Sequence, residues 1–314
     1  MMLDASPIAI AACLVWWAST GAILSLIGRG ESTYRWSMLG AALLGVAAIA
    51  AVVASSRATT TQGAFIAFIA AIGIWGAIEM SFLMGFVVGP RRGPCPPGLT
   101  GWQRFKVSFA ALAHHELLLV AALAALAWLV ADQPNRVALY TFALLWVMRL
   151  STKLNIFLGV SNVSEEVLPA RIGYLKSYFR KAPMNALFPL SVTGATACVF
   201  YFGGLAASPG ASDFERASAA LLATFSALAL IEHWMLVLPL ATAAIWPWAP
   251  APERSAGSLA IGHPTNAAHA GSDPAATGDR PHVRPQVISS AVGRGASPVE
   301  ATIVDIPRQP WRTK

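Results

Sequence analysis

Seven long runs of apolar residues constrain this chain more than any other feature. They lie at about 7–28, 36–54, 63–88, 105–131, 137–160, 184–206 and 217–246. Each is close to the roughly 20 apolar residues that cross a hydrocarbon core of ~30 Å. Because lipid offers no partner to unpaired backbone groups, and because the runs lack barrel alternation, they must be helices. We therefore predict an all-α fold, a polytopic integral membrane bundle of about seven transmembrane helices.

The composition excludes a soluble globular protein. Hydrophobic residues make up 56% of the 314 residues and charged residues only 12%, whereas an average soluble domain has roughly 25% charged residues. A soluble chain this apolar would lack the polar surface to cover its core. The cysteines Cys13, Cys95 and Cys198 form neither a C-x-x-C motif nor a zinc-type pattern with histidine, so they indicate no disulfide framework.

The basic residues of the expected loops predict the orientation in the membrane. Loops 1, 3 and 5 hold Arg29, Arg35, Arg91, Arg92, Arg104, Lys106, Arg171, Lys176, Arg180 and Lys181, whereas loops 2, 4 and 6 hold Arg57, Arg136 and Arg216. Cytoplasmic loops carry the excess of Lys and Arg. We therefore expect a periplasmic N-terminus and a cytoplasmic C-terminus, with the basic cytoplasmic loops binding anionic lipids.

The chain divides into a membrane domain, 1–248, and a tail, 249–314. The tail is rich in Pro, Gly, Ala, Ser and Thr without a hydrophobic period, which predicts a disordered cytoplasmic segment. Within the membrane domain, residues 164–182 place Ile172, Leu175, Tyr178 and Phe179 at i, i+3, i+6 and i+7, with basic residues over much of the remainder. This pattern predicts a short helix on the cytoplasmic membrane face. A nucleic-acid site is not expected, because no folded basic domain surrounds the segment.

Ionisable residues inside the apolar runs are the candidate functional residues. Lipid makes such residues costly, and their usual reason is functional. They are Glu79, His114, His115, Glu116, Arg149, Lys153, Glu232 and His233. At a rise of 1.5 Å per residue, all of them fall about 18–24 Å from the periplasmic edge of the ~30 Å core. Four of the expected helices thus bring charge to one layer in the cytoplasmic half of the membrane.

Three interpretations of this polar layer are open. In the first, the layer is a structural network in which Glu79, Glu116 and Glu232 neutralise Arg149 and Lys153. In the second, the carboxylates and imidazoles bind iron, manganese or zinc, although the sequence has no E-x-x-H or H-x-x-x-H motif in these runs. In the third, the layer binds another membrane component, either a tetrapyrrole through a neutral histidine or a partner helix. No catalytic residue can be assigned.

Several local strings occur in a fixed order along the membrane domain. They are VWWASTGAI at 15–23, YRWSMLGA at 34–41, IEMSFLMGFVVGPRRGPCPPG at 78–98, HHE at 114–116, LWVMRLSTKLNIFLGVSN at 145–162, EEVLPARIGYLKSYFRKAPMNALFPLSVT at 165–193 and IEHWMLVLPL at 231–240. Together they resemble the PuhE family of photosynthetic complex assembly proteins from purple phototrophic bacteria. The resemblance covers about residues 10–248 and leaves out the tail.

The resemblance implies a bacterial inner-membrane protein that supports assembly of the photosynthetic reaction centre and light-harvesting antenna, with an influence on bacteriochlorophyll supply. It implies no catalytic mechanism and requires no cofactor. The expected partners are reaction-centre and antenna membrane subunits, docked where small residues such as Ala41 and Gly45 permit close helix approach. The alternative is a membrane-embedded metal-dependent or pigment-handling enzyme that uses the Glu/His layer.

Overall fold

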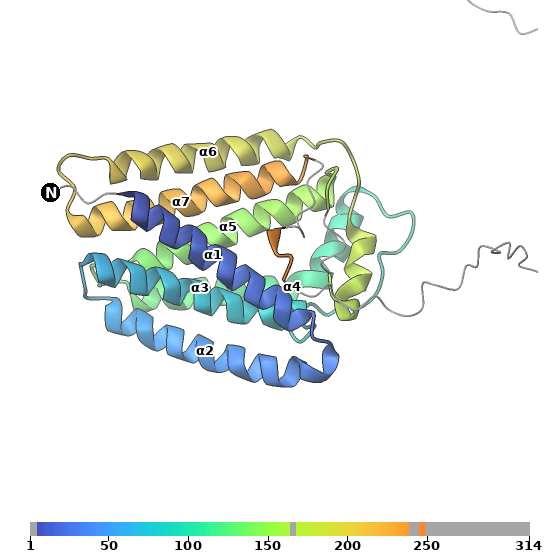
Figure 1. The fold of residues 1–314 in the computed structure, drawn as a ribbon. Coiled ribbons are helices and arrows are strands. Elements are labelled where there is room, and N and C mark those ends of the chain that lie inside the picture. The colour runs from blue at the N-terminus through green and yellow to red at the C-terminus, as the bar shows by residue number, and fades with distance from the viewer. Residues whose placement is uncertain (1–4, 164–167, 239–244, 249–314) are drawn as a thin grey trace, which may run out of the picture. The chain divides into compact units, whose positions relative to one another are not determined.

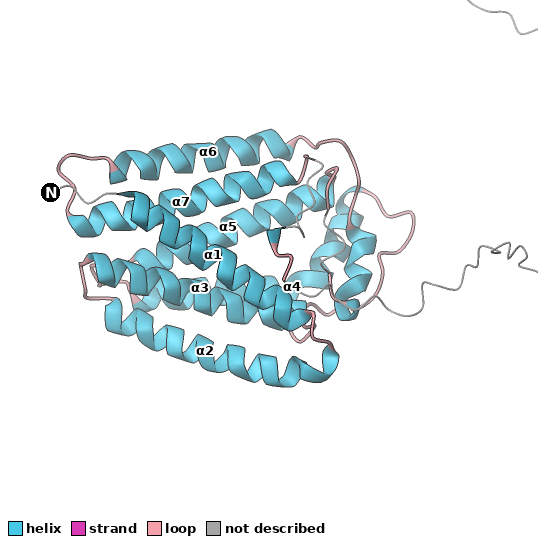
Figure 2. Cartoon of the chain, viewed as in Figure 1, coloured by secondary structure: helices cyan, strands magenta, loops and turns pink. Residues whose placement is uncertain are grey.

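The computed structural model describes residues 5–163, 168–238 and 245–248, and every regular element in these ranges is helical (Figure 2). Seven helices are long and apolar enough to cross a membrane, which confirms the predicted fold class. They are α1 Ala5–Ile27, α2 Tyr34–Ser55, α3 Thr61–Leu83, α4 Gly101–Leu129, α5 Val137–Leu158, α6 Leu187–Ala206 and α7 Asp213–Met235, with 3-10 helices η1 Glu31–Thr33 and η3 Ala170–Tyr178. The expected disordered tail, 249–314, lies outside the described residues.

Helices α3, α5 and α7 form the centre of the bundle and contact one another. Helix α2 packs mainly on α3 and α6 mainly on α7, so these two lie at opposite edges in Figure 1. Aromatic side chains join the central helices: Phe68 of α3 lies edge-on to Phe225 of α7 at 4.6 Å, and Trp75 of α3 to Phe142 of α5 at 5.3 Å. The loops 28–33, 84–100 and 159–186 meet at one end of the bundle, here called the basic end.

The small residues of α2 are used inside the protein. Ala41 and Ala48 are buried, and a Cβ added to Gly45 would lie 3.3 Å from the Cβ of Ala77 in α3. A Cβ added to Gly73 of α3 would likewise lie 3.1 Å from the Cβ of Ala48. These small residues therefore let α2 pack closely on α3 of the same chain. The expectation that Ala41 and Gly45 form a docking surface for partner helices is wrong.

Helix α3 ends five residues before the expected boundary at 88 because Gly85 reverses the chain. Gly85 has a φ of 74°, its N–H donates to Phe82 O over 2.8 Å, and the next N–H, of Phe86, donates to Ser81 O over 2.8 Å. This pair of bonds is the Schellman arrangement that closes helices at a left-handed glycine. The chain then turns back toward α4.

Helix α7 ends at Met235, whereas the sequence pattern predicted an apolar span up to 246. The amide of Asn162 donates to Met235 O over 2.9 Å, and the backbone N–H of Asn162 donates to Leu236 O over 2.9 Å. Pro239, four residues after Met235 in the sequence, has no N–H for that carbonyl and disfavours further helix. A loop residue and a proline thus fix the boundary, which hydropathy alone does not show.

The segment expected as a surface helix over 164–182 is partly a 3-10 helix, η3, and packs on protein. Side chains three apart share one face of a 3-10 helix, and Ile172, Leu175 and Tyr178 are 1%, 5% and 5% exposed. They pack with Phe82 of α3 and Val88 of the following loop. The apolar face is therefore unavailable to lipid, which corrects the expectation of a helix lying on the membrane. Residues 164–167 lie outside the described residues.

Candidate functional site

Helix α5 separates the ionisable residues of the spans into clusters on its two sides. Arg149 and Lys153 are four residues apart and so share one face of the helix, while Ser151 and Asn155 share another, about 200° away from Arg149. The first pair faces α3 and α4, where Lys153 reaches Glu116. The second pair faces α6 and α7, where Ser151 reaches His233. Helix α5 thus connects two separate clusters of the polar layer, and Glu232 belongs to neither.

The first cluster is built around an ion pair between α5 and α4. Lys153 Nζ donates to Glu116 Oε1 over 2.7 Å, with the two side chains 19% and 11% exposed. The same ammonium lies 5.7 Å from the centre of the Phe82 ring on α3, within the range of a cation–π contact. The Lys153 ammonium of α5 therefore contacts residues of two other helices, Glu116 of α4 and Phe82 of α3.

Glu79 and His115 form the buried part of this cluster. They are 4% and 0% exposed, and the 3.6 Å between Glu79 Oε1 and His115 Nε2 is longer than a good hydrogen bond. Among the described residues, neither ring nitrogen of His115 has a hydrogen-bond partner within normal distance, and the ring stacks on Phe82 at 4.4 Å. Lys153 and Arg149 also act electrostatically on Glu79. The carboxylate therefore interacts with His115 at 3.6 Å and with the positive charges of Lys153 and Arg149.

The two remaining residues on this side make no close polar contact. Arg149 is half-buried and, within the described part of the chain, its guanidinium forms no hydrogen bond or ion pair. The expected Glu–Arg149 pair is thus replaced by a longer-range interaction with Glu79. His114, next to buried His115, is exposed on the outside of α4. Adjacent helical positions point about 100° apart, which explains the difference.

The second cluster is a chain of hydrogen bonds around His233, which is 0% exposed. His233 Nδ1 lies 2.8 Å from Ala229 O, and a carbonyl only accepts, so Nδ1 carries a proton. Nε2 lies 2.9 Å from Ser151 Oγ, which lies 2.9 Å from Ser191 Oγ of α6. Ser151 Oγ donates to Ser191 Oγ, whose own proton goes to Leu187 O over 3.0 Å, so in this order the ring nitrogen Nε2 is the donor to Ser151. With a neutral imidazole, Ser151 would donate to Nε2 instead.

Two asparagines extend this cluster to the helix ends. Asn155 Nδ2 donates to Ser191 Oγ over 2.9 Å, and its Oδ1 accepts from Asn185 Nδ2 over 3.1 Å. Asn185 Oδ1 accepts the backbone N–H groups of Leu187 and Phe188 at the start of α6, and its Nδ2 donates to Gly159 O over 2.9 Å at the end of α5. The Asn185 side chain therefore caps the start of α6 and also binds the backbone at the end of α5.

Glu232 belongs to a third place, between α7 and α1. Trp16 Nε1 donates to Glu232 Oε1 over 3.2 Å. The Trp16 ring lies 5.5 Å from that of Trp246, whose indole N–H donates to Trp17 O over 2.9 Å. Residues 245 and 246, expected at the end of the last span, thus lie against α1. Glu232 neutralises neither Arg149 nor Lys153 by a direct contact, contrary to the network first considered.

No group of three or more His, Cys, Asp or Glu side chains within the described ranges is arranged to hold a metal ion. The nearest approach is the pair Glu79 and His115. Ser151, Ser191 and Asn185 are functional candidates that the search for ionisable residues missed. A Ser–Asn pair at i, i+4 inside an apolar run, 151 and 155, was the available signal.

Basic residues of the expected loops have structural tasks at the basic end. The guanidinium of Arg104 donates to Phe157 O over 2.9 Å and to Tyr178 O over 2.6 Å. Arg91 Nε donates to the hydroxyl of Tyr178 over 3.0 Å, and Arg171 donates to Met84 O over 3.2 Å. These arginines bind the loops of the basic end to the helix ends. Their expected effect on the orientation of the chain in the membrane is a separate role.

The comparisons with known proteins give one family model and one curated relative. The family model described as "Protein of unknown function (DUF3623)" matches residues 2–256. A relative from Rhodobacter capsulatus, named "Uncharacterized 30.4 kDa protein in puhA 5'region", is 39% identical over 245 residues, which cover 77% of this chain and 89% of the relative. No solved structure matches the chain. Since the match spans all seven helices, the chain belongs to the family described as protein of unknown function DUF3623.

Proposed function

We propose that this multi-pass membrane protein is a non-enzymatic assembly factor for a photosynthetic reaction centre and its light-harvesting antenna. The observation that carries the proposal is the relative from Rhodobacter capsulatus, whose name refers to the puhA 5′ region. That gene name shares its stem with the PuhE family, which the ordered strings of residues 10–248 resemble. The site of action is the bacterial inner membrane, with the N-terminus periplasmic and the basic end cytoplasmic.

The geometry of the polar clusters supports a scaffold rather than a catalyst. His115 and His233 are 0% exposed, so neither imidazole is accessible to a substrate in this arrangement. Their clusters connect α3 with α4 and α5, and α5 with α6 and α7. A fixed bundle leaves the outer helix faces as the surfaces for partners.

The outer face of α6 is suited to a client transmembrane helix. Phe200 and Tyr201 are 75% and 65% exposed, and a Cβ added to Gly194 or Gly204 would meet nothing within 4 Å. Glycines let a second helix approach closely, and exposed aromatic rings add contact area to such an interface. In the proposed function this face receives reaction-centre or antenna helices during assembly.

The first test is a deletion strain examined by absorption spectroscopy of its membranes. The proposal expects loss of assembled reaction-centre and antenna bands while free bacteriochlorophyll is still made. Accumulation of a pigment precursor would instead show an enzymatic step and overturn the proposal. Complementation with Gly194→Leu should restore the protein level but not the complexes. Ala47→Leu, which adds similar volume on the exposed face of α2, is the matched control and should restore both.

His114 favours a second candidate function, pigment handling. Its imidazole is exposed on α4, 13 residues from the start of that helix, at a depth where a polar group facing lipid is costly. A neutral imidazole there could ligate the central metal of a tetrapyrrole. Absorption spectroscopy and elemental analysis of the purified protein test this. A stoichiometric tetrapyrrole band that disappears in His114→Leu would establish pigment handling, and its absence from the wild type would remove it.

A further inference from the structure

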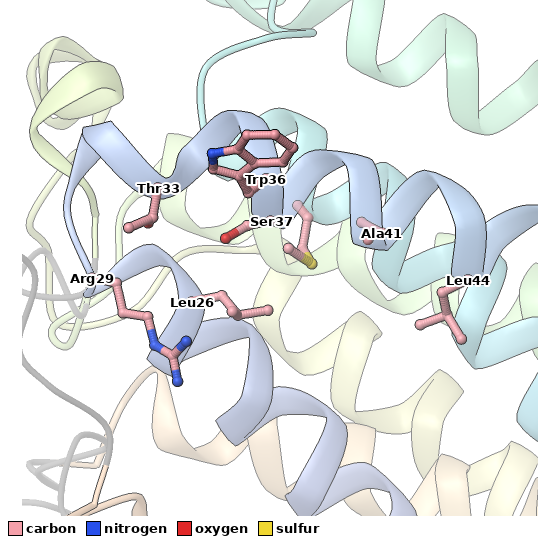
Figure 3. Close-up of a pocket in the computed structure, with 9 residues that line it drawn as sticks. Leu26, Arg29, Thr33, Trp36, Ser37, Ala41 and Leu44 are labelled. Atoms are coloured by element: carbon pink, nitrogen blue, oxygen red, sulfur yellow. The ribbon is translucent and has the colours of Figure 1, made fainter.

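A groove opens between α1, α2 and α3 at the basic end of the bundle, with a volume of about 520 Å³ (Figure 3). Its upper wall is the start of α2 and its lower wall the end of α1, and Met80 of α3 also lines it. A volume of this size is typical of a small-molecule site. The groove is separate from both polar clusters described above.

The mouth of the groove is polar and positively charged. Arg29 follows the last residue of α1, Ile27, by two positions, so it lies where a span ends and lipid headgroups begin. Its side chain makes no hydrogen bond or ion pair within the described part of the chain. Thr33 and Ser37 line the same mouth. The nearby carboxylate of Glu31 is directed to Arg171, 3.9 Å away, so its charge is shared with another cation.

The body of the groove is apolar and runs along α2 toward the middle of the span. Leu26 and Leu44 line its sides, and buried Ala41 and Met80 form its floor. Gly40 also lines it, and a Cβ at this position would meet nothing within 4 Å. The missing side chain at Gly40 therefore keeps open a channel one side chain deep along the surface of α2.

We propose that this groove is a specific site for one anionic phospholipid. A phosphodiester at the mouth would accept hydrogen bonds from the unpaired Arg29 guanidinium and the Ser37 hydroxyl. One acyl chain would lie along Gly40 and Leu44 over the floor. A zwitterionic lipid offers the same chain but no net negative charge, so the charge of Arg29 selects the anionic class. This proposal is independent of the assembly role.

Native mass spectrometry of the purified full chain tests the proposal. The protein is titrated with phosphatidylglycerol and, separately, with phosphatidylcholine of the same acyl chains. We expect one phosphatidylglycerol to bind more tightly than any phosphatidylcholine and to resist 10-fold excess inorganic phosphate. Arg29→Gln should weaken it about fivefold, equivalent to the ~1 kcal/mol that a basic residue contributes near a membrane surface. Gly40→Leu, which fills the channel, should remove the tight site.

Two matched variants separate a specific site from general attraction. Arg57→Gln removes an exposed charge at the opposite end of α2, and Gly204→Leu adds the same side chain to an open position on α6; both should bind as the wild type does. Equal binding of the two lipids, or equal loss in Arg57→Gln and Arg29→Gln, would overturn the proposal. Displacement by inorganic phosphate would show a phosphate site without lipid recognition. Wild-type binding by Gly40→Leu would place the lipid elsewhere.

Discussion

Lys153 and Glu116 are joined by a hydrogen bond of 2.7 Å between Nζ and Oε1, which connects α5 to α4 inside the membrane domain. Both side chains are mostly buried, so each charge depends on the other for the loss of its hydration. Among the described residues, it is the only ion pair between two spanning helices in which the cation is a lysine or an arginine. Removing this ion pair should therefore lower the stability of the whole bundle.

Lys153→Met should destabilise the protein strongly. Glu116 would remain as a buried carboxylate without its partner, and breaking a buried pair in this way typically costs about 3–5 kcal/mol in soluble proteins, less where water enters. Thermal unfolding in detergent measures the change. The double variant Glu116→Gln/Lys153→Met should recover much of the loss. Arg149→Gln, which removes a charge without a close partner, is the control and should lower stability less than Lys153→Met.

Ser151→Ala should lower stability by about 1–3 kcal/mol, the cost of leaving a buried polar group unsatisfied. The variant removes the partner of His233 Nε2 and one neighbour of Ser191. Ser218→Ala is the matched control, because the hydroxyl of Ser218 bonds only within its own helix, to Phe214 O. Its expected change is within about 0.5 kcal/mol. Equal unfolding temperatures for the two variants would contradict a structural role for the His233 chain.

Asn185 allows the capping bonds to be separated from the bonds to α5. Asn185→Asp keeps the oxygen that accepts from Leu187 and Phe188 but loses the donor to Asn155 and Gly159. Asn185→Ala loses both sets. We expect Ala to cost more than Asp by about 1 kcal/mol, the usual worth of a cap. Denaturation curves in detergent would give the difference, and identical losses would mean that the cap contributes nothing.

The fold was predictable because each helix is apolar along nearly its whole length. The helix ends were less predictable. Gly85 closes α3 without interrupting the apolar run in which it lies, and the end of α7 is bound by Asn162, a loop residue far from it in the sequence. The segment 164–182 was misjudged since its apolar residues fit both a lipid surface and a protein surface. Only the tertiary contact of Ile172 with the bundle distinguishes these.

The candidate site was predictable in its residues but not in its pairings. Hydropathy marks Lys153 and Glu116 as costly inside a span, and depth places them in one layer. Which carboxylate meets which cation depends on helix rotation, which composition does not fix. Glu232, which we expected in the same layer, accepts a hydrogen bond from Trp16 of α1 instead of pairing with a cation. The role of neutral residues such as Ser151 could not be predicted, because a hydroxyl in a helix can donate to a backbone carbonyl of the same helix and needs no partner on another helix.

The orientation is testable by paired reporters. A reporter inserted in loop 56–60, between α2 and α3, should read as periplasmic, and one inserted at Gly93 in loop 84–100 as cytoplasmic, because the basic loops are expected on the cytoplasmic side. Insertion at residues 207–212, between α6 and α7, should agree with loop 56–60. Readings that are reversed at all three sites would invert the proposed topology, and equal readings at the first two would remove the span between them.

Gly89 provides the sharpest test of how the loop after α3 fits the bundle. In the loop, Val88 O accepts the backbone N–H of His115 over 2.9 Å, and the N–H of Arg91 donates to Ala110 O over 3.3 Å. A Cβ on Gly89 would overlap Ala110 O and come within 2.5 Å of the Ala111 carbonyl carbon. These are backbone atoms of α4 and cannot swing aside, so the loop or the helix must move.

Gly89→Ala should therefore destabilise the protein by about 1–3 kcal/mol, the usual cost of overpacking. The displaced loop should also disturb His115, whose backbone N–H donates to Val88 O. Gly93→Ala is the matched control in the same loop, since a Cβ there meets nothing within 4 Å. Thermal unfolding in detergent and limited proteolysis of the loop compare the two. If both variants unfold at the wild-type temperature, the loop does not approach α4 as closely as the structure shows.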